Sequence, residues 1–292
     1  MAWRAVVRVL RSPLNSVTSV ILPADCRTCG DPLSSLHRVP VCSSCWKDLP
    51  SQSASICFRC GEDLGISDFG EMAAENLLCR PCRLAPPAFA RAVAHGPYRG
   101  TIRSLLHLLK YEGWEPVAKR LGTLIAKQAA AMRGLPRRML VVPVPLFKAR
   151  RRERGFNQSE LLAWAAVRAM RSLRPQWEGE LAPWVLARQR ATESQAGLSL
   201  HERRRNLRGA FSVSEPAWVR GRDVLLIDDI YTTGATARAC SQVLKRAGAA
   251  TVWVATVARA QRRQIEAFRP GAVADVLMHL DIAKWDGGKT LQ

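Results

Sequence analysis

The stretch that decides the fold runs from Val224 to Thr236 and reads VLLIDDIYTTGAT. Four apolar residues lead into two adjacent acids, and hydroxyl residues, a glycine and an alanine follow. An unbroken apolar run is typical of a strand buried on both faces of a parallel sheet. In open α/β sheets ligands bind beyond the carboxyl ends of the strands, which is where Asp228 and Asp229 are expected to lie.

The residues after the two acids predict a phosphate-binding turn that opens a helix. The first N–H groups of a helix have no partner within it, and the helix dipole favours an anion there. Because like charges repel, Asp228 and Asp229 would accept hydrogen bonds from vicinal ribose hydroxyls and leave a 5′-phosphate to the turn. The predicted phosphate cradle consists of Thr232, Thr233, Gly234, Ala235 and Thr236.

Apolar runs and helical periodicity alternate along the chain after about residue 86. The expected strands are 90–94, 139–145, 223–228 and 251–259, with shorter candidates at 184–190 and 208–213. The expected helices are 98–109, 113–132, 159–170 and 236–248, and the basic segment 146–158 is expected to form a loop. This alternation predicts a parallel sheet with right-handed crossovers.

Eight of the nine cysteines form four C-x-x-C pairs in an internal repeat, in which CRTCGDPL at 26–33 matches CFRCGEDL at 57–64. Four thiolates suit a tetrahedral Zn²⁺ ion, and paired spacing without a secretory signal favours metal over disulfides. We therefore expect two structural zinc sites. Sequential use of the pairs is favoured over an interleaved arrangement, which stays open. The predicted ligands are Cys26, Cys29, Cys42, Cys45, Cys57, Cys60, Cys79 and Cys82.

The composition favours a folded protein with anionic partners. The chain has 292 residues, 48% of them hydrophobic, and that fraction suits a packed core. The formal net charge of +20 favours nucleic acid, a phosphorylated ligand or an acidic membrane surface as a partner. A compositional habit of the source genome is the alternative explanation.

The N-terminal residues do not predict a membrane segment. No apolar run reaches the roughly 18–20 residues that a spanning helix needs. Arginines interrupt the first residues, so 2–10 is expected to form a short basic amphipathic helix that packs on the protein. The expected location is the cytoplasm.

The stretch 224–236 resembles the 5-phosphoribosyl-1-pyrophosphate (PRPP) motif of type I phosphoribosyltransferases. The cysteine repeat, LLKYEG, VPVPLFKARRRERGFNQSELLA and RATESQAGLSLHERRRNLRGAF precede it in this order. Together these segments resemble the ComF/GntX family. The resemblance implies an α/β fold: an N-terminal double zinc ribbon followed by a type I phosphoribosyltransferase-like, Rossmann-type domain with a mainly parallel sheet. The corresponding domain boundaries are 1–85, 86–260 and a C-terminal extension, 261–292.

The resemblance also implies roles for individual residues. Asp228 and Asp229 would be the ribose-binding acids of a catalytic centre that takes PRPP with Mg²⁺. The basic segment would face pyrophosphate or DNA phosphates through Lys148, Arg151, Arg154 and Gly155. The alternative that this segment is only a solvated basic surface stays open. A second polar segment would form a mobile loop with Arg190, Thr192, Gln195, Arg203 and Asn206. Lys110 is a weaker candidate, since an exposed lysine at a helix end explains it equally well.

Two functions compete at this level. The first is a ComF-like protein that binds PRPP and single-stranded DNA in DNA uptake, natural transformation or the use of imported DNA, with DNA-uptake proteins as possible partners. Arginine runs beside Phe156 and Phe211 suit single strands, the rings stacking on bases. The alternative is an active phosphoribosyltransferase with an unidentified acceptor and no DNA role. A PRPP-sensing regulator of duplex DNA is disfavoured because no helix-turn-helix pattern is present.

Overall fold

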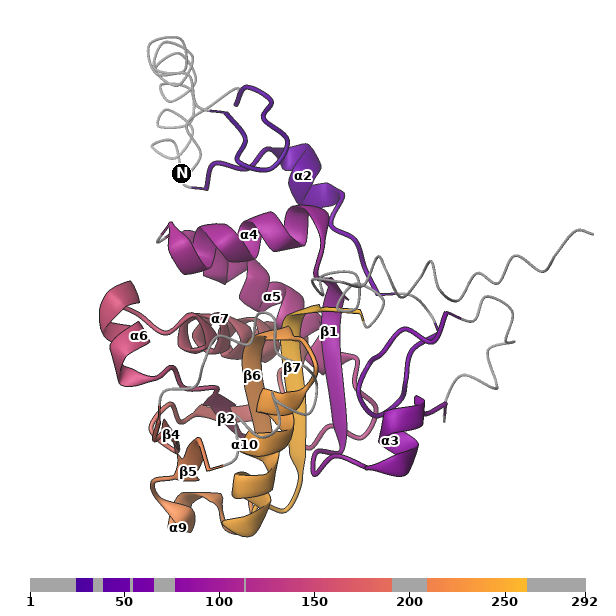
Figure 1. The fold of residues 1–292 in the computed structure, drawn as a ribbon, viewed down its shortest axis with the longest axis vertical. Helices are drawn as coiled ribbons and strands as arrows, with labels where there is room; N and C mark the ends of the chain where they lie inside the picture. Colours follow the sequence, from indigo (N-terminus) through magenta and orange to yellow (C-terminus); the bar gives the residue numbers. More distant parts are fainter. Residues whose placement is uncertain are drawn as a thin grey trace, which may run out of the picture.

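The computed structural model describes residues 25–33, 39–52, 55–65, 77–112, 114–190 and 209–261. Its centre is a five-stranded sheet with the order β1-β7-β6-β2-β3, in which every neighbouring pair is parallel (Figure 1). The strands are β1 (Arg91–Pro97), β2 (Arg138–Pro143), β3 (Glu178–Leu181), β6 (Val224–Tyr231) and β7 (Val252–Arg259). The predicted α/β fold with a mainly parallel sheet is confirmed.

The apolar run of β6 fills two cores, one on each face of the sheet. Leu225 and Ile227 belong to one hydrophobic cluster, whereas Val224 and Leu226 belong to the other. Successive side chains of a strand point to opposite faces, so a strand at the centre of the sheet must be apolar at every position. This requirement explains why the run is continuous rather than alternating.

Helices cover both faces of the sheet (Figure 1). One face packs against α4 (Gly100–Tyr111), α5 (Pro116–Ala130) and α7 (Gln158–Leu173). The other face packs against α10 (Ala235–Arg246) and a separate antiparallel pair, β4 (Leu186–Arg188) and β5 (Phe211–Val213). The short helix α9 (Pro216–Val219) precedes β6.

The two cysteine units lie on opposite faces of the sheet. Cys26 and Cys45 of the first unit, with its helix α2 (Ser43–Lys47), join the core formed with α4, α5 and α7. The cysteines of the second unit, with its helix α3 (Arg80–Leu84), join the core formed with α10. The internal repeat is therefore tandem in sequence but divided between the two cores in space.

One local expectation is wrong, and one strand was not expected. The segment 146–158 is not a loop throughout, because Lys148–Arg154 forms the helix α6, which ends at Gly155 with a φ of 77°. A run of arginines has good helix propensity, and a glycine in the left-handed region is a common helix end. The edge strand β3 was not predicted, because its sequence, EGEL, lacks the apolar pattern of a buried strand.

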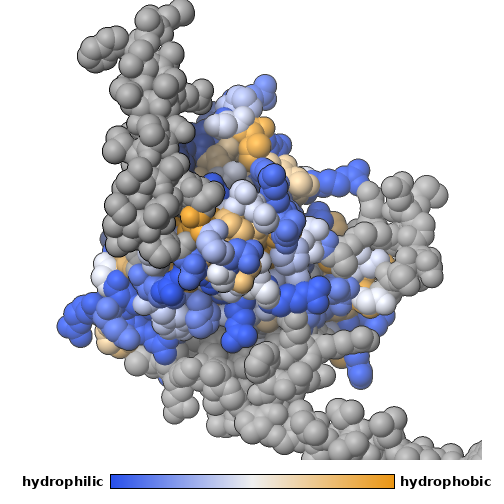
Figure 2. Space-filling model, turned by 90° about the horizontal axis from the view of Figure 1, so that it is seen from above, coloured by the Kyte–Doolittle hydropathy of each residue, from blue (hydrophilic) through white to orange (hydrophobic). Residues whose placement is uncertain are grey.

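Several expectations fall outside the described residues. They are the helix at 2–10, the C-terminal extension from 262 onward, and Thr192, Gln195, Arg203 and Asn206 of the second polar segment. Within the described residues, no helix is long and apolar enough to cross a membrane. Figure 2 shows one face of the molecule, on which hydrophilic residues occupy most of the described surface and apolar ones show between them.

Candidate functional site

The carboxyl edge of the sheet contains a topological switch point between β2 and β6. From β2 the chain crosses one face through α7 to β3, and from β6 it crosses the other face through α10 to β7. The two connections leave the sheet in opposite directions, so a crevice opens where β2 and β6 end. Ligands of open α/β sheets bind in this type of crevice.

Both acids of the motif lie at this edge, and each has a partner from another element. Ser159, in the first turn of α7, donates through its Oγ to Asp228 Oδ1 at 2.9 Å. Lys110, near the end of α4, forms an ion pair with Asp229. The side chains of Lys110 and Asp229 are only 16% and 7% exposed, so this pair is largely shielded from water.

Capping of α7 explains how Ser159 reaches the acids. The side chain of Asn157 accepts from the N–H of Ser159 and donates to the carbonyl of Val144, both at 3.1 Å. Val144 directly follows β2, so the Asn157 side chain ties the start of α7 to the end of that strand. An asparagine cap of this kind satisfies one of the free N–H groups of the helix.

Burial and neighbouring charges shift the pKa values of Asp228 and Lys110. Burial, together with the neighbouring Asp229 charge, raises the pKa of Asp228 to about 8. Burial alone would lower the pKa of Lys110, but the charge of Asp229 and their hydrogen bond outweigh it, so the pKa is raised. The carboxyl group of Asp228 is therefore easier to protonate than that of an exposed aspartate, and it lies beside the Lys110–Asp229 ion pair.

The turn after the acids is closely packed around a glycine. Gly234 has a φ of 76° and precedes α10 as its N-cap. A Cβ atom at this position would lie 2.2 Å from Tyr231 Oη, so only glycine fits. The cavity beneath the turn has a volume of only about 10 Å³, so a ligand would lie over the turn rather than beneath it.

The predicted basic residues lie on and beside α6, which follows β2 at the same edge. Lys148 and Arg151 are exposed, and Arg151 pairs with Glu160 of α7 at 3.3 Å. Arg154 is half-buried, with Nη1 donating to Gln158 Oε1 at 3.2 Å. Gly155 ends α6, whereas Arg190 lies after β4 and is exposed.

An exposed aromatic ring lies beside this basic segment. Tyr111 ends α4 directly after Lys110 and is 66% exposed. The guanidinium carbon of Arg154 lies 5.2 Å from the centre of the Tyr111 ring. The contact between Arg154 and Tyr111 therefore connects the basic segment to α4, the helix that carries Lys110.

Several sequence-based interpretations of single residues change in the structure. The reading of Lys110 as an exposed helix end is wrong, because Asp229 draws it into the site. Phe211 is only 5% exposed and Phe156 is partly buried against the core, so neither offers the fully open ring proposed for stacking. Cys240 is fully buried, as predicted. Ser159 was not predicted as a site residue, because a serine in the first turn of a helix is common.

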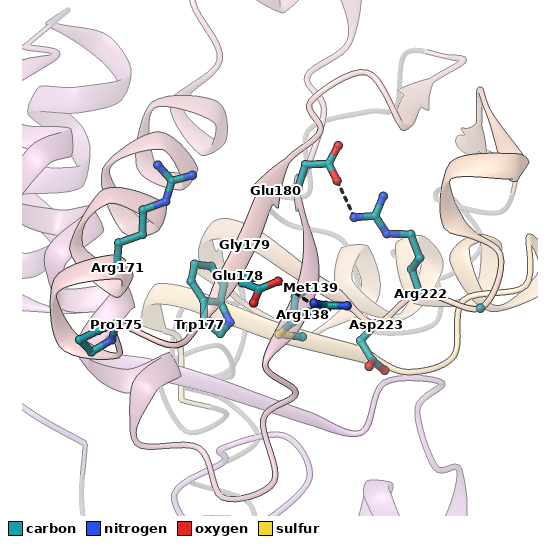
Figure 3. Close-up of a pocket in the computed structure, with 11 residues that line it drawn as sticks. Arg138, Met139, Arg171, Pro175, Trp177, Glu178, Gly179, Glu180, Arg222 and Asp223 are labelled. Atoms are coloured by element: carbon teal, nitrogen blue, oxygen red, sulfur yellow. Dashed lines mark hydrogen bonds and ion pairs between the residues drawn. The ribbon is translucent and has the colours of Figure 1, made fainter.

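A larger hollow, of about 740 Å³, lies at the opposite, amino-terminal edge of the sheet (Figure 3). Its charged side chains largely compensate one another: Arg138 pairs with Glu178 at 2.8 Å, and Arg222 pairs with Glu180 at 2.6 Å. The hollow lies at the ends of the strands where open α/β sheets do not bind their ligands. The carboxyl edge is therefore the candidate site.

The eight paired cysteines form two clusters, as the sequential arrangement predicts. Within each cluster all the sulfur atoms lie within 4.8 Å of one another, which fits four thiolates around one zinc ion. Four protein ligands leave no open position for a substrate, so each site is structural. The clusters are Cys26, Cys29, Cys42 and Cys45, and Cys57, Cys60, Cys79 and Cys82.

The fold and the cysteine clusters define a class of protein in which a double zinc ribbon is joined to a parallel α/β domain. Residues 17–83 match the family model described as a double zinc ribbon domain. The chain is 34% identical to DNA utilization protein YhgH of Escherichia coli O157:H7, covering 80% of this chain and 96% of that protein. It is 29% identical to Competence protein F of Haemophilus influenzae, over 75% and 90% of the two chains. The chain belongs to the ComF/GntX family.

Among the similar solved structures is a glutamine PRPP amidotransferase of Bacillus subtilis in complex with ADP and GMP, matched over 48% of this chain and 26% of its own. The sequence identity is 23% and the TM-score is 0.30.

Proposed function

We propose that this protein binds PRPP with Mg²⁺ at the carboxyl edge of its sheet and acts with single-stranded DNA in DNA uptake or the use of imported DNA. The observation that carries the proposal is the convergence of the acid pair, the Gly234 turn and α6 on the crevice between β2 and β6. The names of the relatives, DNA utilization protein and competence protein, support the DNA part.

The surroundings of each residue suggest how it would contact PRPP. Asp228 and Asp229 would hold the ribose hydroxyls, with Ser159 and Lys110 fixing their positions. The 5′-phosphate would lie over residues 232–236, at the N-terminus of α10. The pyrophosphate would face α6, where Lys148 and the arginines supply positive charge and bidentate donors.

The magnesium ion would be held mainly by the ligand. Lys110 already pairs with Asp229, and burial raises the pKa of Asp228, so the two acids do not form a strong cation site by themselves. Mg²⁺ commonly binds through substrate phosphates and retains several waters. It would supply positive charge to the pyrophosphate.

Catalytic transfer of the phosphoribosyl group is the alternative function. The bond from C1 to the pyrophosphate oxygen would break as a nucleophile attacks C1, and the basic residues of α6 would stabilise the departing pyrophosphate. Pyrophosphate release in the presence of a base, an amine or a nucleic acid would support this alternative. Its absence with every acceptor would leave a binding role.

Replacing Asp228 with alanine should weaken PRPP binding about tenfold or more, because hydrogen bonds to the ribose hydroxyls are lost. Titration calorimetry with PRPP and Mg²⁺ at pH 7.5 measures the change. Asp223→Ala is the matched control, since Asp223 directly precedes the amino end of the same strand. Absence of binding by the wild-type protein, or equal losses in both variants, would refute the proposed site.

The DNA part of the proposal rests on charge and on an exposed ring at the same edge. Lys148, Arg151 and Arg152 are exposed on α6, and Tyr111 offers an aromatic surface beside Arg154. Proteins that bind single strands combine arginines for the phosphates with rings for the bases. Tyr111, the more exposed ring, therefore replaces Phe211 and Phe156 as the candidate stacking residue.

The variant Arg151→Gln/Arg152→Gln should bind a single-stranded oligonucleotide more weakly. Each lost phosphate contact should lower the slope of log K against log salt concentration by about 0.7, hence by up to about 1.4. Fluorescence anisotropy at several salt concentrations measures both effects.

The matched control is Arg168→Gln/Arg171→Gln, which removes the same charge from exposed positions in the distal half of α7. Equal weakening in both variants would mean that net charge, rather than α6, governs DNA binding. A Tyr111→Leu variant should weaken binding without changing the salt slope, because stacking releases no counterions.

A further inference from the structure

A buried arginine connects the second cysteine cluster to the turn that follows the acid pair. Arg259 ends β7 and is only 3% exposed. Its register partner on the neighbouring strand is Tyr231, the last residue of β6. The guanidinium carbon of Arg259 lies 4.2 Å from the centre of the Tyr231 ring, in cation–π contact.

The other contacts of Arg259 lead to the cysteine cluster. Its Nη1 donates to the carbonyl oxygen of Cys60 at 2.6 Å, and its Nη2 donates to Cys60 Sγ at 3.6 Å. The same Nη2 forms an ion pair with Glu62. Four thiolates around Zn²⁺ carry a net charge of about −2 by formal count, and donors to the ligating sulfur fix its position and offset this charge.

On its other side, Tyr231 supports the phosphate-binding turn. The space that a side chain at Gly234 would need is occupied by the Tyr231 ring and hydroxyl. Phe89 packs edge-on against this ring with a centroid distance of 6.3 Å. The position of Tyr231 therefore sets the position of the turn, and Arg259 covers one face of Tyr231.

Loss of the metal would remove the partners of Arg259. Small cysteine units depend on their metal for folding, so the loop that carries Cys60 and Glu62 would loosen without it. A buried guanidinium without acceptors is strongly unfavourable, so Arg259 would have to move toward water. Tyr231 would then lose its cation–π partner, and the turn its support.

The first cysteine cluster has contacts of a different kind. Arg27, within this unit, forms an exposed ion pair with Glu112 at 2.7 Å. Arg120 of α5 lies over the Trp46 ring at 4.6 Å. These contacts join the first unit to α4 and α5, on the face of the sheet opposite to α10, so this cluster provides an internal control.

We propose that Arg259 makes ligand binding at the 232–236 turn dependent on metal bound at the second cysteine cluster. Arg259 is a positioning residue, because it acts through Tyr231 without touching the ligand. The inference rests on the proposed function for the identity of the ligand, PRPP. The coupling itself concerns only the turn and the metal, so it can also be measured without ligand.

The experiment compares four variants with the wild-type full-length protein. Arg259→Met removes the connection and Arg259→Lys retains a charge without the guanidinium fork. Cys79→Ser/Cys82→Ser empties the second cluster and Cys29→Ser/Cys42→Ser empties the first. Zinc content, amide hydrogen exchange of residues 229–238 and calorimetric affinity for PRPP with Mg²⁺ are measured for each.

Arg259→Met and the second-cluster variant should accelerate exchange in 229–238 at least tenfold and weaken PRPP binding at least tenfold. Arg259→Lys should have an intermediate effect, because an ammonium group cannot span Cys60, Glu62 and the Tyr231 ring together. The first-cluster variant should change both quantities less than twofold.

The remaining outcomes decide against the coupling or against the ligand. If Arg259→Met and the second-cluster variant leave exchange within twofold of wild type, the coupling is wrong, whatever the affinity. If emptying the first cluster has the same effect as emptying the second, the effect is explained by general destabilisation of the protein and not by the Arg259 connection. If wild-type protein does not bind PRPP but exchange responds as expected, the proposed function fails while the coupling stands.

Discussion

A Lys110→Met variant should lose about 3–5 kcal/mol of unfolding free energy. The change leaves the Asp229 carboxylate buried without its ionic partner, and removal of one member of a buried pair has a cost of this size. Methionine retains the length and most of the packing of the lysine side chain, so the effect reports mainly on charge. Urea unfolding at pH 7.5, followed by circular dichroism, measures the difference.

The control for this variant is Lys119→Met, an exposed position on α5, where a change within about 0.5 kcal/mol is expected. A second variant, Lys110→Met/Asp229→Asn, should recover much of the loss because no buried charge remains. If Lys110→Met is no more destabilising than Lys119→Met, the Lys110–Asp229 pair does not hold the acid site together.

Gly234→Ala should be the second most damaging substitution. A non-glycine residue in the left-handed region costs about 1–3 kcal/mol, and here the new Cβ would also lie 2.2 Å from Tyr231 Oη. The turn must therefore move or the ring must rotate, and PRPP affinity should fall at least tenfold. Thermal unfolding and titration calorimetry measure the two effects.

The matched control is Gly221→Ala. Gly221 has a φ of 71°, but the space around its Cβ position is open to at least 4 Å, and it lies before β6 at the opposite edge of the sheet. Gly221→Ala therefore has the conformational cost of alanine at a positive φ but no steric clash of the new Cβ atom. If the two alanine variants are equally stable and bind PRPP equally, close packing between the turn and Tyr231 is unimportant.

The two cysteine units have separate structural tasks despite their similar sequences. The first packs with α4, the helix that supplies Lys110 to the acid pair. The second packs with the core beneath α10 and contacts Arg259. The two units thus pack on different faces of the sheet, and the contact with Arg259 links the second unit to the turn at 232–236.

Local patterns were sufficient to predict most of the fold and half of the candidate site. The strand–acid–turn–helix order of 224–236 and the C-x-x-C pairs depend on neighbours in sequence, so their chemistry can be read from spacing. The partners of the acids cannot be read in this way. Ser159 and Asp228 are 69 residues apart, and either residue alone has a common explanation in a helix or strand.

The sequence by itself determined the parallel α/β class, the eight cysteine ligands, and the acids and glycine of the turn, because short-range sterics and ligand chemistry specify them. The grouping of these cysteines into two sites of four was decided by the structure. Only the tertiary structure decided that the repeated units lie on opposite faces, that Lys110 neutralises Asp229, and that Arg259 meets Cys60 across 199 positions of sequence. The physical reason is that a buried charged group needs a partner of opposite charge. That partner can lie anywhere in the sequence, because burial depends on how the whole chain packs.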